Sequence, residues 1–157
     1  NKQMKNFIAI PLILLFLSCQ STVKKEATKI KNERKTPDHT VALKFINDYT
    51  QNRVGNVIDW PIVSEKFKSE LKRIINKAEK EAPGYGLGFD PVIDAQDYPL
   101  SGFKLSATND ISSEFVTVSC KEWKNFDITV KLIWKNDKWL VDGSGIINIP
   151  TEKQAER

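Results

Sequence analysis

The sequence predicts an α+β domain in which two amphipathic helices precede an antiparallel sheet. Between residues 41 and 78, apolar side chains recur every three to four positions, which is the period of a helix with one buried face. From residue 103 onward the apolar period changes to two, as in strands with one buried face. Helices and strands that are segregated along the chain are typical of the α+β class.

The first helix is expected to start at Thr36-Pro37 and to end at Gly55, and the second to start after the cap Ser64 and to stop at Pro83-Gly84. Both stripes of apolar residues define a buried face. The stripes are Val41, Phe45, Ile46 and Tyr49 in the first helix, and Phe67, Leu71, Ile74, Ile75 and Ala78 in the second.

Four strands are expected at residues 103–108, 113–121, 126–135 and from 139 onward. Asn136-Asp137 predicts a tight hairpin turn, and Gly143-Ser144-Gly145 indicates a bulge. We therefore expect one domain over residues 37–150, followed by a disordered tail at 151–157. Five residues of the third strand are expected to face the core together with Trp139, namely Phe126, Ile128, Val130, Leu132 and Trp134.

Residues 1–18 have the layout of a secretory leader. Lys2 and Lys5 precede an apolar run over residues 7–17. This run is shorter than the about 20 residues that a helix needs to cross the hydrocarbon core of a membrane, but it has the length of the apolar region of a signal peptide. Ser18-Cys19 closes this run and resembles the cleavage site of bacterial lipoproteins. The resemblance implies residues 1–18 as signal peptide, acyl groups such as palmitate on Cys19, and a location in the cell envelope, at the outer membrane facing the periplasm. An ordinary secretory signal and an uncleaved anchor are the alternatives.

The net charge of +4 is concentrated near this leader. Residues 1–18 carry two lysines (+2), residues 19–36 carry six basic and two acidic residues (+4), and residues 37–157 carry 16 basic and 18 acidic residues (−2). Residues 19–36 hold few apolar side chains and are expected to form a flexible basic tether. The domain has no basic excess for contacts to phosphates, so we expect no nucleic-acid partner.

Two segments of the domain resemble a known family. They are Asp90-Pro91-Val92-Ile93-Asp94-Ala95-Gln96-Asp97 and the strand ending Trp134-Lys135-Asn136-Asp137-Lys138-Trp139-Leu140-Val141-Asp142. Together with the helix pair, they resemble uncharacterised bacterial lipoproteins with a nuclear transport factor 2-like, cystatin-like domain. The resemblance covers roughly residues 38–148. It implies a curved sheet wrapped around helices as a cone with a pocket at its open end, and it implies no established activity.

Asp90, Asp94 and Asp97 stand at i, i+4 and i+7, so a helix would place the three carboxylates on one face. They could form a polar site at the mouth of the pocket, or cap local turns as aspartate often does. We expect Asp90 and Asp97 to be scaffold residues, because each stands where a proline turns the chain. Asp94 and Gln96 are then the candidates for ligand binding.

Tyr85 and Trp60 complete the candidate ligand-binding residues. Tyr85 lies in the glycine-rich connector 84–88 and is expected to edge the pocket with Leu87 and Phe89, while Trp60 precedes Pro61 in an irregular stretch. We expect no metal and no cofactor, because the single histidine, His39, has no cysteine near it and is expected to be solvated. Cys120 is expected to be a buried thiol of the core.

The leading function is a non-enzymatic binding module, attached to the membrane through its lipid, for a small molecule, peptide or protein partner. One alternative is an enzyme of the ketosteroid-isomerase or dehydratase kind, with an aspartate base and Tyr85 or Tyr98 as oxyanion donor. A second alternative is an immunity-type inhibitor of a toxin. An enclosed pocket around a carboxyl of raised pKa favours the enzyme, whereas a filled cone favours a binder.

Overall fold

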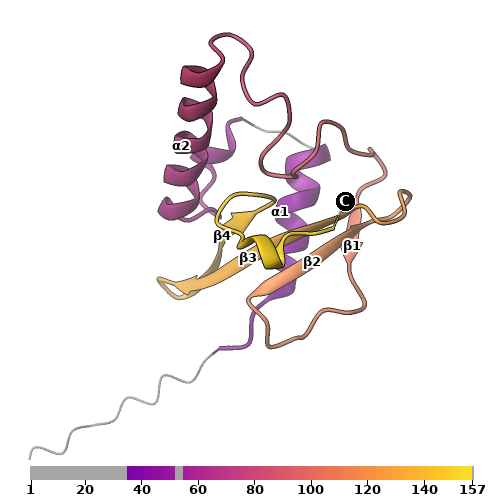
Figure 1. The fold of residues 1–157 in the computed structure, drawn as a ribbon. Coiled ribbons are helices and arrows are strands. Elements are labelled where there is room, and N and C mark those ends of the chain that lie inside the picture. The colour runs from indigo at the N-terminus through magenta and orange to yellow at the C-terminus, as the bar shows by residue number, and fades with distance from the viewer. Residues whose placement is uncertain (1–34, 52–54, 157) are drawn as a thin grey trace, which may run out of the picture. The chain divides into compact units, whose positions relative to one another are not determined.

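The computed structural model describes residues 35–51 and 55–156 (Figure 1). The predicted signal peptide, Cys19 and the tether up to residue 34 lie outside this part. Over the described residues, no helix combines the length and the apolar character needed to cross a membrane. The elements are α1 (His39–Gln51), the 3₁₀ helix η1 (Val57–Asp59), α2 (Glu65–Glu81), β1 (Phe103–Leu105), β2 (Phe115–Cys120), β3 (Asp127–Lys135), β4 (Lys138–Ser144) and the 3₁₀ helix η2 (Thr151–Lys153).

The predicted α+β class is confirmed for the described residues. The strands form one antiparallel meander in the order β1-β2-β3-β4, α1 contacts all of them, and α2 contacts β4 (Figure 1). The turn between β3 and β4 is the predicted one. Asn136 and Asp137 both have positive φ, 52° and 57°, as a two-residue turn of the primed type requires.

Both helices begin at a side-chain cap. Ser64 caps α2 as predicted, with its hydroxyl accepting the N–H of Phe67 at 3.0 Å. The first helix begins at His39, two residues later than predicted, because Asp38 and not Thr36 supplies the cap. The Asp38 carboxylate accepts the N–H of Thr40 at 3.0 Å.

The bulge in β4 lies at Asp142, one residue before the segment Gly143-Ser144-Gly145 in which it was predicted. Lys131 pairs with Gly143 and Leu132 pairs with Val141, so Asp142 is the extra residue on β4. Gly145, at the far end of the segment predicted to bulge, instead lies against the loop that contains Pro91 and Val92. Gly145 has a φ of +58° and lies where a Cβ atom would be only 2.5 Å from the carbonyl oxygen of Pro91.

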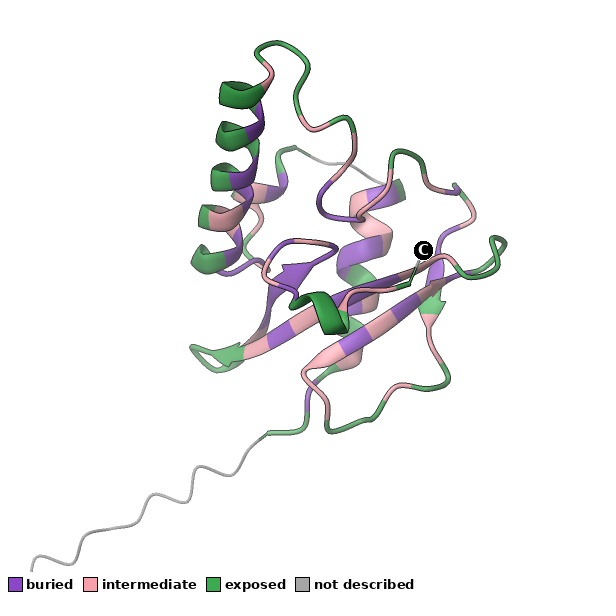
Figure 2. Ribbon diagram, in the orientation of Figure 1, coloured by how far each residue is buried: buried purple, intermediate pink, exposed green. Residues whose placement is uncertain are grey.

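The buried cluster contains most of the predicted core (Figure 2). Eight residues of the predicted helix and strand faces are in it, and Trp139 is partly buried against it. The eight are Phe45, Ile46, Phe67, Leu71, Ile74, Ile128, Val130 and Leu132. The prediction that Trp134 belongs to the core is wrong. It is 38% exposed, because it stands at the end of β3, where its ring packs on Trp139.

The segment at 151–157, predicted to be disordered, includes η2. Its neighbour Gln154 donates its side-chain amide to the carbonyl oxygen of Ile149 at 3.1 Å. The ammonium of Lys153 lies 6.0 Å from the centre of the Phe115 ring. The segment therefore contacts Phe115 of β2 and Ile149 at the end of the domain, and its polar composition did not indicate these contacts.

Candidate functional site

The segment from Asp90 to Ala95 is a closed loop and not a helix. The N–H of Asp90 donates to the carbonyl oxygen of Ala95 at 2.8 Å, and the Asp90 carboxylate accepts the N–H of Val92 at 2.9 Å. Asp94 has a φ of 53°, which ends any right-handed helical run. The hypothesis of three carboxylates on one helical face is therefore wrong.

This loop inserts its apolar tip into the core. Val92 and Ile93 are both 0% exposed and belong to the main buried cluster. The hydroxyl of Ser144 donates to the carbonyl oxygen of Val92 at 2.7 Å, and the N–H of Ile146 donates to Pro91 at 3.1 Å. The loop is thus anchored to the end of β4, and its tip forms part of the core.

Asp90 has the contacts of a scaffold residue. Besides the N–H of Val92, its carboxylate accepts the hydroxyl of Tyr49 at 2.7 Å. The ring of Tyr49 lies 6.2 Å from that of Trp60, which also packs edge-on against Phe45 at 5.9 Å. One predicted binding residue, Trp60, is therefore half-buried in an aromatic cluster that supports the loop.

The other predicted binding residues lie outside this aromatic cluster. Asp94 is half-buried on the loop, Gln96 is exposed just beyond it, and Tyr85 is 88% exposed on the connector. Asp97 accepts the N–H of the next residue, Tyr98, at 2.8 Å. None of the residues Asp94, Gln96, Tyr85 and Trp60 lines either of the two hollows described below, so their role in binding stays a prediction.

An apolar hollow of about 430 Å³ lies beside the Tyr49–Asp90 contact. Leu87 and Phe89 of the connector line it, whereas Tyr85 does not. Ile75 of α2 also lines the hollow and is 49% exposed, so the apolar stripe of α2 continues beyond the covered core. The full lining is Tyr49, Asn56, Val57, Leu71, Ile75, Leu87, Phe89, Asp90, Pro91 and Val92.

Sequence reasoning assigned Ile75 to the core and missed this hollow. The pattern that could have indicated it is the width of the apolar stripe of α2. Ile75 directly follows Ile74 and makes this stripe wider than the face that the core covers. Such a hollow can receive an apolar side chain or a small apolar molecule, with the Tyr49–Asp90 pair as its polar edge.

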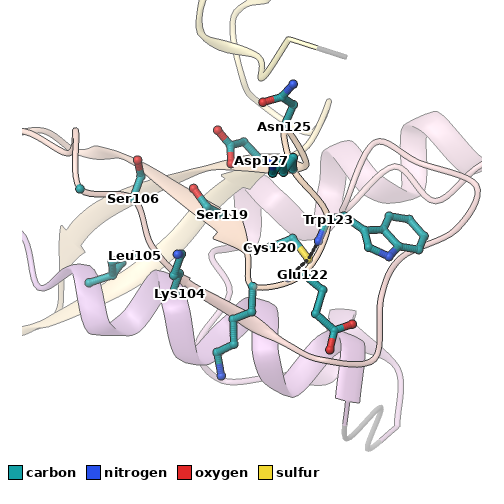
Figure 3. A pocket seen from close by; sticks show the side chains of 12 residues that line it. Lys104, Leu105, Ser106, Ser119, Cys120, Glu122, Trp123, Asn125 and Asp127 are labelled. Carbon is teal, nitrogen blue, oxygen red and sulfur yellow. Dashed lines mark hydrogen bonds between the residues drawn. The ribbon is translucent and has the colours of Figure 1, made fainter.

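A second hollow, an open groove of about 600 Å³, lies over β1 and the β2–β3 connection (Figure 3). Its lining mixes both charges, with Lys104, Lys121 and Lys124 beside Glu122 and Asp127. Figure 3 shows Lys104 of β1, Ser106 just after it and Ser119 of β2, with the Trp123 ring directed outward. The mixture of charges gives the groove no preference for ligands of one sign.

Cys120 is buried, as expected, at the edge of this groove. Its sulfur accepts the N–H groups of Glu122 at 3.3 Å and Trp123 at 3.1 Å. These bonds hold the chain where it leaves β2. The thiol therefore helps to shape the β2–β3 connection.

His39 is not simply solvated, contrary to expectation. Its Nε2 lies 3.0 Å from the carbonyl oxygen of Ser113, and a carbonyl only accepts, so Nε2 carries the proton of this bond. The half-buried ring joins the start of α1 to the chain before β2. This role is structural.

Carboxyl groups with a displaced pKa do not mark a catalytic base. Hydrogen bonds from Lys68, Arg73 and Ser112 lower the pKa of Glu65, Glu70 and Asp110, respectively. A base of the isomerase kind needs the opposite displacement. Among the residues that the structure describes, no group of His, Cys, Asp and Glu could hold a metal ion.

No family model, curated protein or solved structure matches the chain.

Proposed function

We propose that this protein is a lipid-anchored protein of the cell envelope, attached through Cys19 to the outer membrane and facing the periplasm. Its domain is a non-enzymatic module that binds a partner. The leader supports the anchor, because lysines precede an apolar run of signal-peptide length that ends at Ser18-Cys19. A tether of mostly polar residues then leads to the domain.

We also infer that the domain is a nuclear transport factor 2-like cone with a filled interior. The antiparallel meander with α1 across it is compatible with such a cone. The observation that carries the functional proposal is the burial of Val92 and Ile93, which are 0% exposed and fill part of the interior of the domain. A filled interior favours a binder that uses its surface.

The enzyme alternative needs a carboxyl with a raised pKa in an enclosed apolar pocket. The half-buried carboxylate of Asp90 accepts hydrogen bonds from Tyr49 and Val92. The buried carboxylate of Asp142 accepts hydrogen bonds from Ser64 and Lys131. Both carboxylates are therefore held by hydrogen bonds within the fold. We therefore place the binding module ahead of the enzyme.

The apolar hollow is the proposed contact surface, because Ile75, Leu87 and Phe89 offer an apolar patch with a polar edge. The partner would insert an apolar group between α2 and the connector. Nucleic acid is not a proposed partner, since residues 37–157 carry two more acidic than basic residues, 18 against 16.

Affinity capture from solubilised envelope, with the intact protein and matched variants, tests this proposal. Ile75→Glu places a charge in the hollow and should abolish stoichiometric recovery of the partner. Ile111→Glu is the control, because Ile111 is 72% exposed and lies outside the hollow. Equal recovery with both variants would contradict the proposed contact surface.

A further inference from the structure

Two tryptophans lie at the end of the β3–β4 hairpin. The rings of Trp134 and Trp139 are 5.5 Å apart at 64°, and Trp134 is 38% exposed. They precede and follow the tight turn at Asn136-Asp137, so the aromatic pair sits at a projecting end of the sheet (Figure 1).

Lysines surround this aromatic pair. Lys135 and Lys138 flank the turn, and the ammonium of Lys138 lies 3.5 Å from the carbonyl oxygen of Pro61. The ammonium of Lys35 lies 3.9 Å from the centre of the Trp134 ring, within the range of a cation–π contact. Three positive charges therefore meet at the hairpin end.

The first turn of α2 borders the same region. The N–H of Ser64, the cap of α2, donates to the carbonyl oxygen of Val141 in β4 at 2.9 Å, so α2 begins beside the strand that follows the hairpin turn. The region called here the tether-side patch contains Trp134, Trp139, Lys35, Lys135 and Lys138.

The patch carries a clear positive excess. Its three lysines are accompanied by the carboxylate of Asp137 in the turn, while Glu65 at the start of α2 is paired with Lys68 at 2.8 Å. The excess contrasts with the domain as a whole, where acidic residues outnumber basic ones by 18 to 16 over residues 37–157. The patch therefore complements a negatively charged surface.

The chain itself leads from the proposed lipid to this patch. Lys35 is the first described residue and stands 16 positions after Cys19. Even a fully extended tether of that length spans at most about 55 Å. Lys35 contacts Trp134 directly, so the tether joins the domain at the patch.

A second exposed tryptophan provides the comparison. Trp123 is 43% exposed in the β2–β3 connection, with Lys121 and Lys124 beside it. It lies at the other end of β3 and is not where the tether enters. Exposure and local lysines are similar at the two ends, and the entry of the tether distinguishes them.

We propose that the tether-side patch docks the domain onto a lipid surface with anionic headgroups, with Trp134 and Trp139 at headgroup depth. This inference rests on the lipid anchor of the proposed function. Tryptophan rings favour the membrane–water interface, and lysines extend their ammonium groups toward anionic headgroups. A lipid chain combined with a basic patch binds a membrane more stably than either alone.

The test uses the full chain, expressed with its leader, purified in detergent and reconstituted into vesicles. The vesicles consist of phosphatidylcholine with or without phosphatidylglycerol, and their acyl chains are brominated to quench tryptophan fluorescence. Quenching is expected with phosphatidylglycerol, and high salt should reduce it by screening the lysines. Trp134→Phe should reduce the quenching, because it removes one of the two docked indole rings, whereas the matched control Trp123→Phe should leave it unchanged.

Charge variants give a second measurement that does not depend on the aromatic pair. Lys135→Gln with Lys138→Gln should shift the domain toward the undocked state, by about fivefold for each lysine. Lys121→Gln with Lys124→Gln, at the Trp123 end, is the matched control and should have no effect. Equal effects of the two pairs would overturn the docking surface.

Flotation with the vesicles separates this inference from the anchor. Flotation on both vesicle types without quenching, or with quenching that Trp123→Phe removes, would overturn the docking surface while the anchor stands. Flotation only on anionic vesicles, with Trp134 quenched, would support docking and contradict the anchor. Failure to float on either type would overturn both.

Discussion

The hydroxyl of Ser64 donates a hydrogen bond of 2.7 Å to the carboxylate of Asp142, which joins the start of α2 to β4. The other oxygen of this carboxylate accepts the ammonium of Lys131 at 2.9 Å, and the Asp142 side chain is almost fully buried. Ser64 at the same time accepts the N–H of Phe67. One buried carboxylate therefore links β3, β4 and the cap of α2.

Asp142→Ala should destabilise the domain by about 3 kcal/mol. The substitution leaves the mostly buried ammonium of Lys131 without its partner, and breaking a buried pair costs about 3–5 kcal/mol. Denaturant unfolding measures the change. Asp48→Ala is the control, because it breaks only the exposed Lys44–Asp48 pair of α1, and such pairs contribute about 0–1 kcal/mol. Equal losses for both variants would show that Asp142 has no special role.

Leu132→Ala should lower the free energy of unfolding by about 2–5 kcal/mol, the usual cost of truncating a buried leucine. Leu132 is 0% exposed in the centre of the main cluster, so its removal leaves a cavity. Ile111→Ala removes an exposed apolar side chain and should change the same quantity by less than about 0.5 kcal/mol. A small effect at Leu132 would contradict the register of β3 with β4.

Gly145→Ala tests the seat of the Asp90–Ala95 loop. A Cβ atom at Gly145 would lie 2.5 Å from the oxygen of Pro91 and 2.8 Å from that of Val92, so the loop must move. We expect a loss of about 2–4 kcal/mol, from the positive φ together with the overpacking. Thermal unfolding with near-ultraviolet circular dichroism reports the loss and the displaced loop.

Gly84→Ala is the matched control for that substitution. Gly84 also has a positive φ, +82°, but nothing lies within 4 Å of the position that a Cβ atom would take there. Its substitution should cost only about 1–2 kcal/mol, the conformational term alone. Equal losses of unfolding free energy for Gly145→Ala and Gly84→Ala would show that the close approach of the loop to Gly145 does not contribute to the cost.

Asp90→Ala and Asp94→Asn should separate scaffold from binding within the loop. Asp90→Ala removes the acceptor for Tyr49 and Val92, and each lost cap of this kind costs about 0.5–2 kcal/mol. Asparagine tolerates the positive φ of Asp94, so Asp94→Asn removes only charge and should change stability by less than about 1 kcal/mol. The melting temperature and the recovery of the partner are measured for both.

The contrast between the two variants decides the role of Asp94. Weakened capture of the partner by Asp94→Asn, with stability retained, would support its role in binding. A large fall in the melting temperature on Asp94→Asn, with capture intact, would make it a scaffold residue.

Stability should fall in acid partly through Glu70. Hydrogen bonds from Arg73 lower the pKa of Glu70 in the folded protein below its ordinary value of 4.5. A lowered folded pKa means that this stabilisation is complete above 4.5 and is lost as the pH falls through the folded pKa. The difference in unfolding free energy between the wild type and Glu70→Gln should therefore shrink toward zero in strong acid. A difference that does not change with pH would contradict the assignment.

Local interactions explain why parts of the fold could be predicted from the sequence alone. The cap at Ser64, the stop at Pro83 and the turn at Asn136-Asp137 each depend on residues within about four positions. The alternation along β3 identified its buried face for the same reason. These features set the α+β order, whereas the leader and Cys19 remain sequence predictions.

Only the tertiary structure decided the features that carry the functional argument. The helical spacing of Asp90, Asp94 and Asp97 did not produce a helix, because burying Val92 and Ile93 against the end of β4 requires a closed loop. The contact of Lys35 with Trp134 joins residues that are far apart in the sequence. Long-range packing of this kind depends on which faces meet after folding, and no local pattern encodes that meeting.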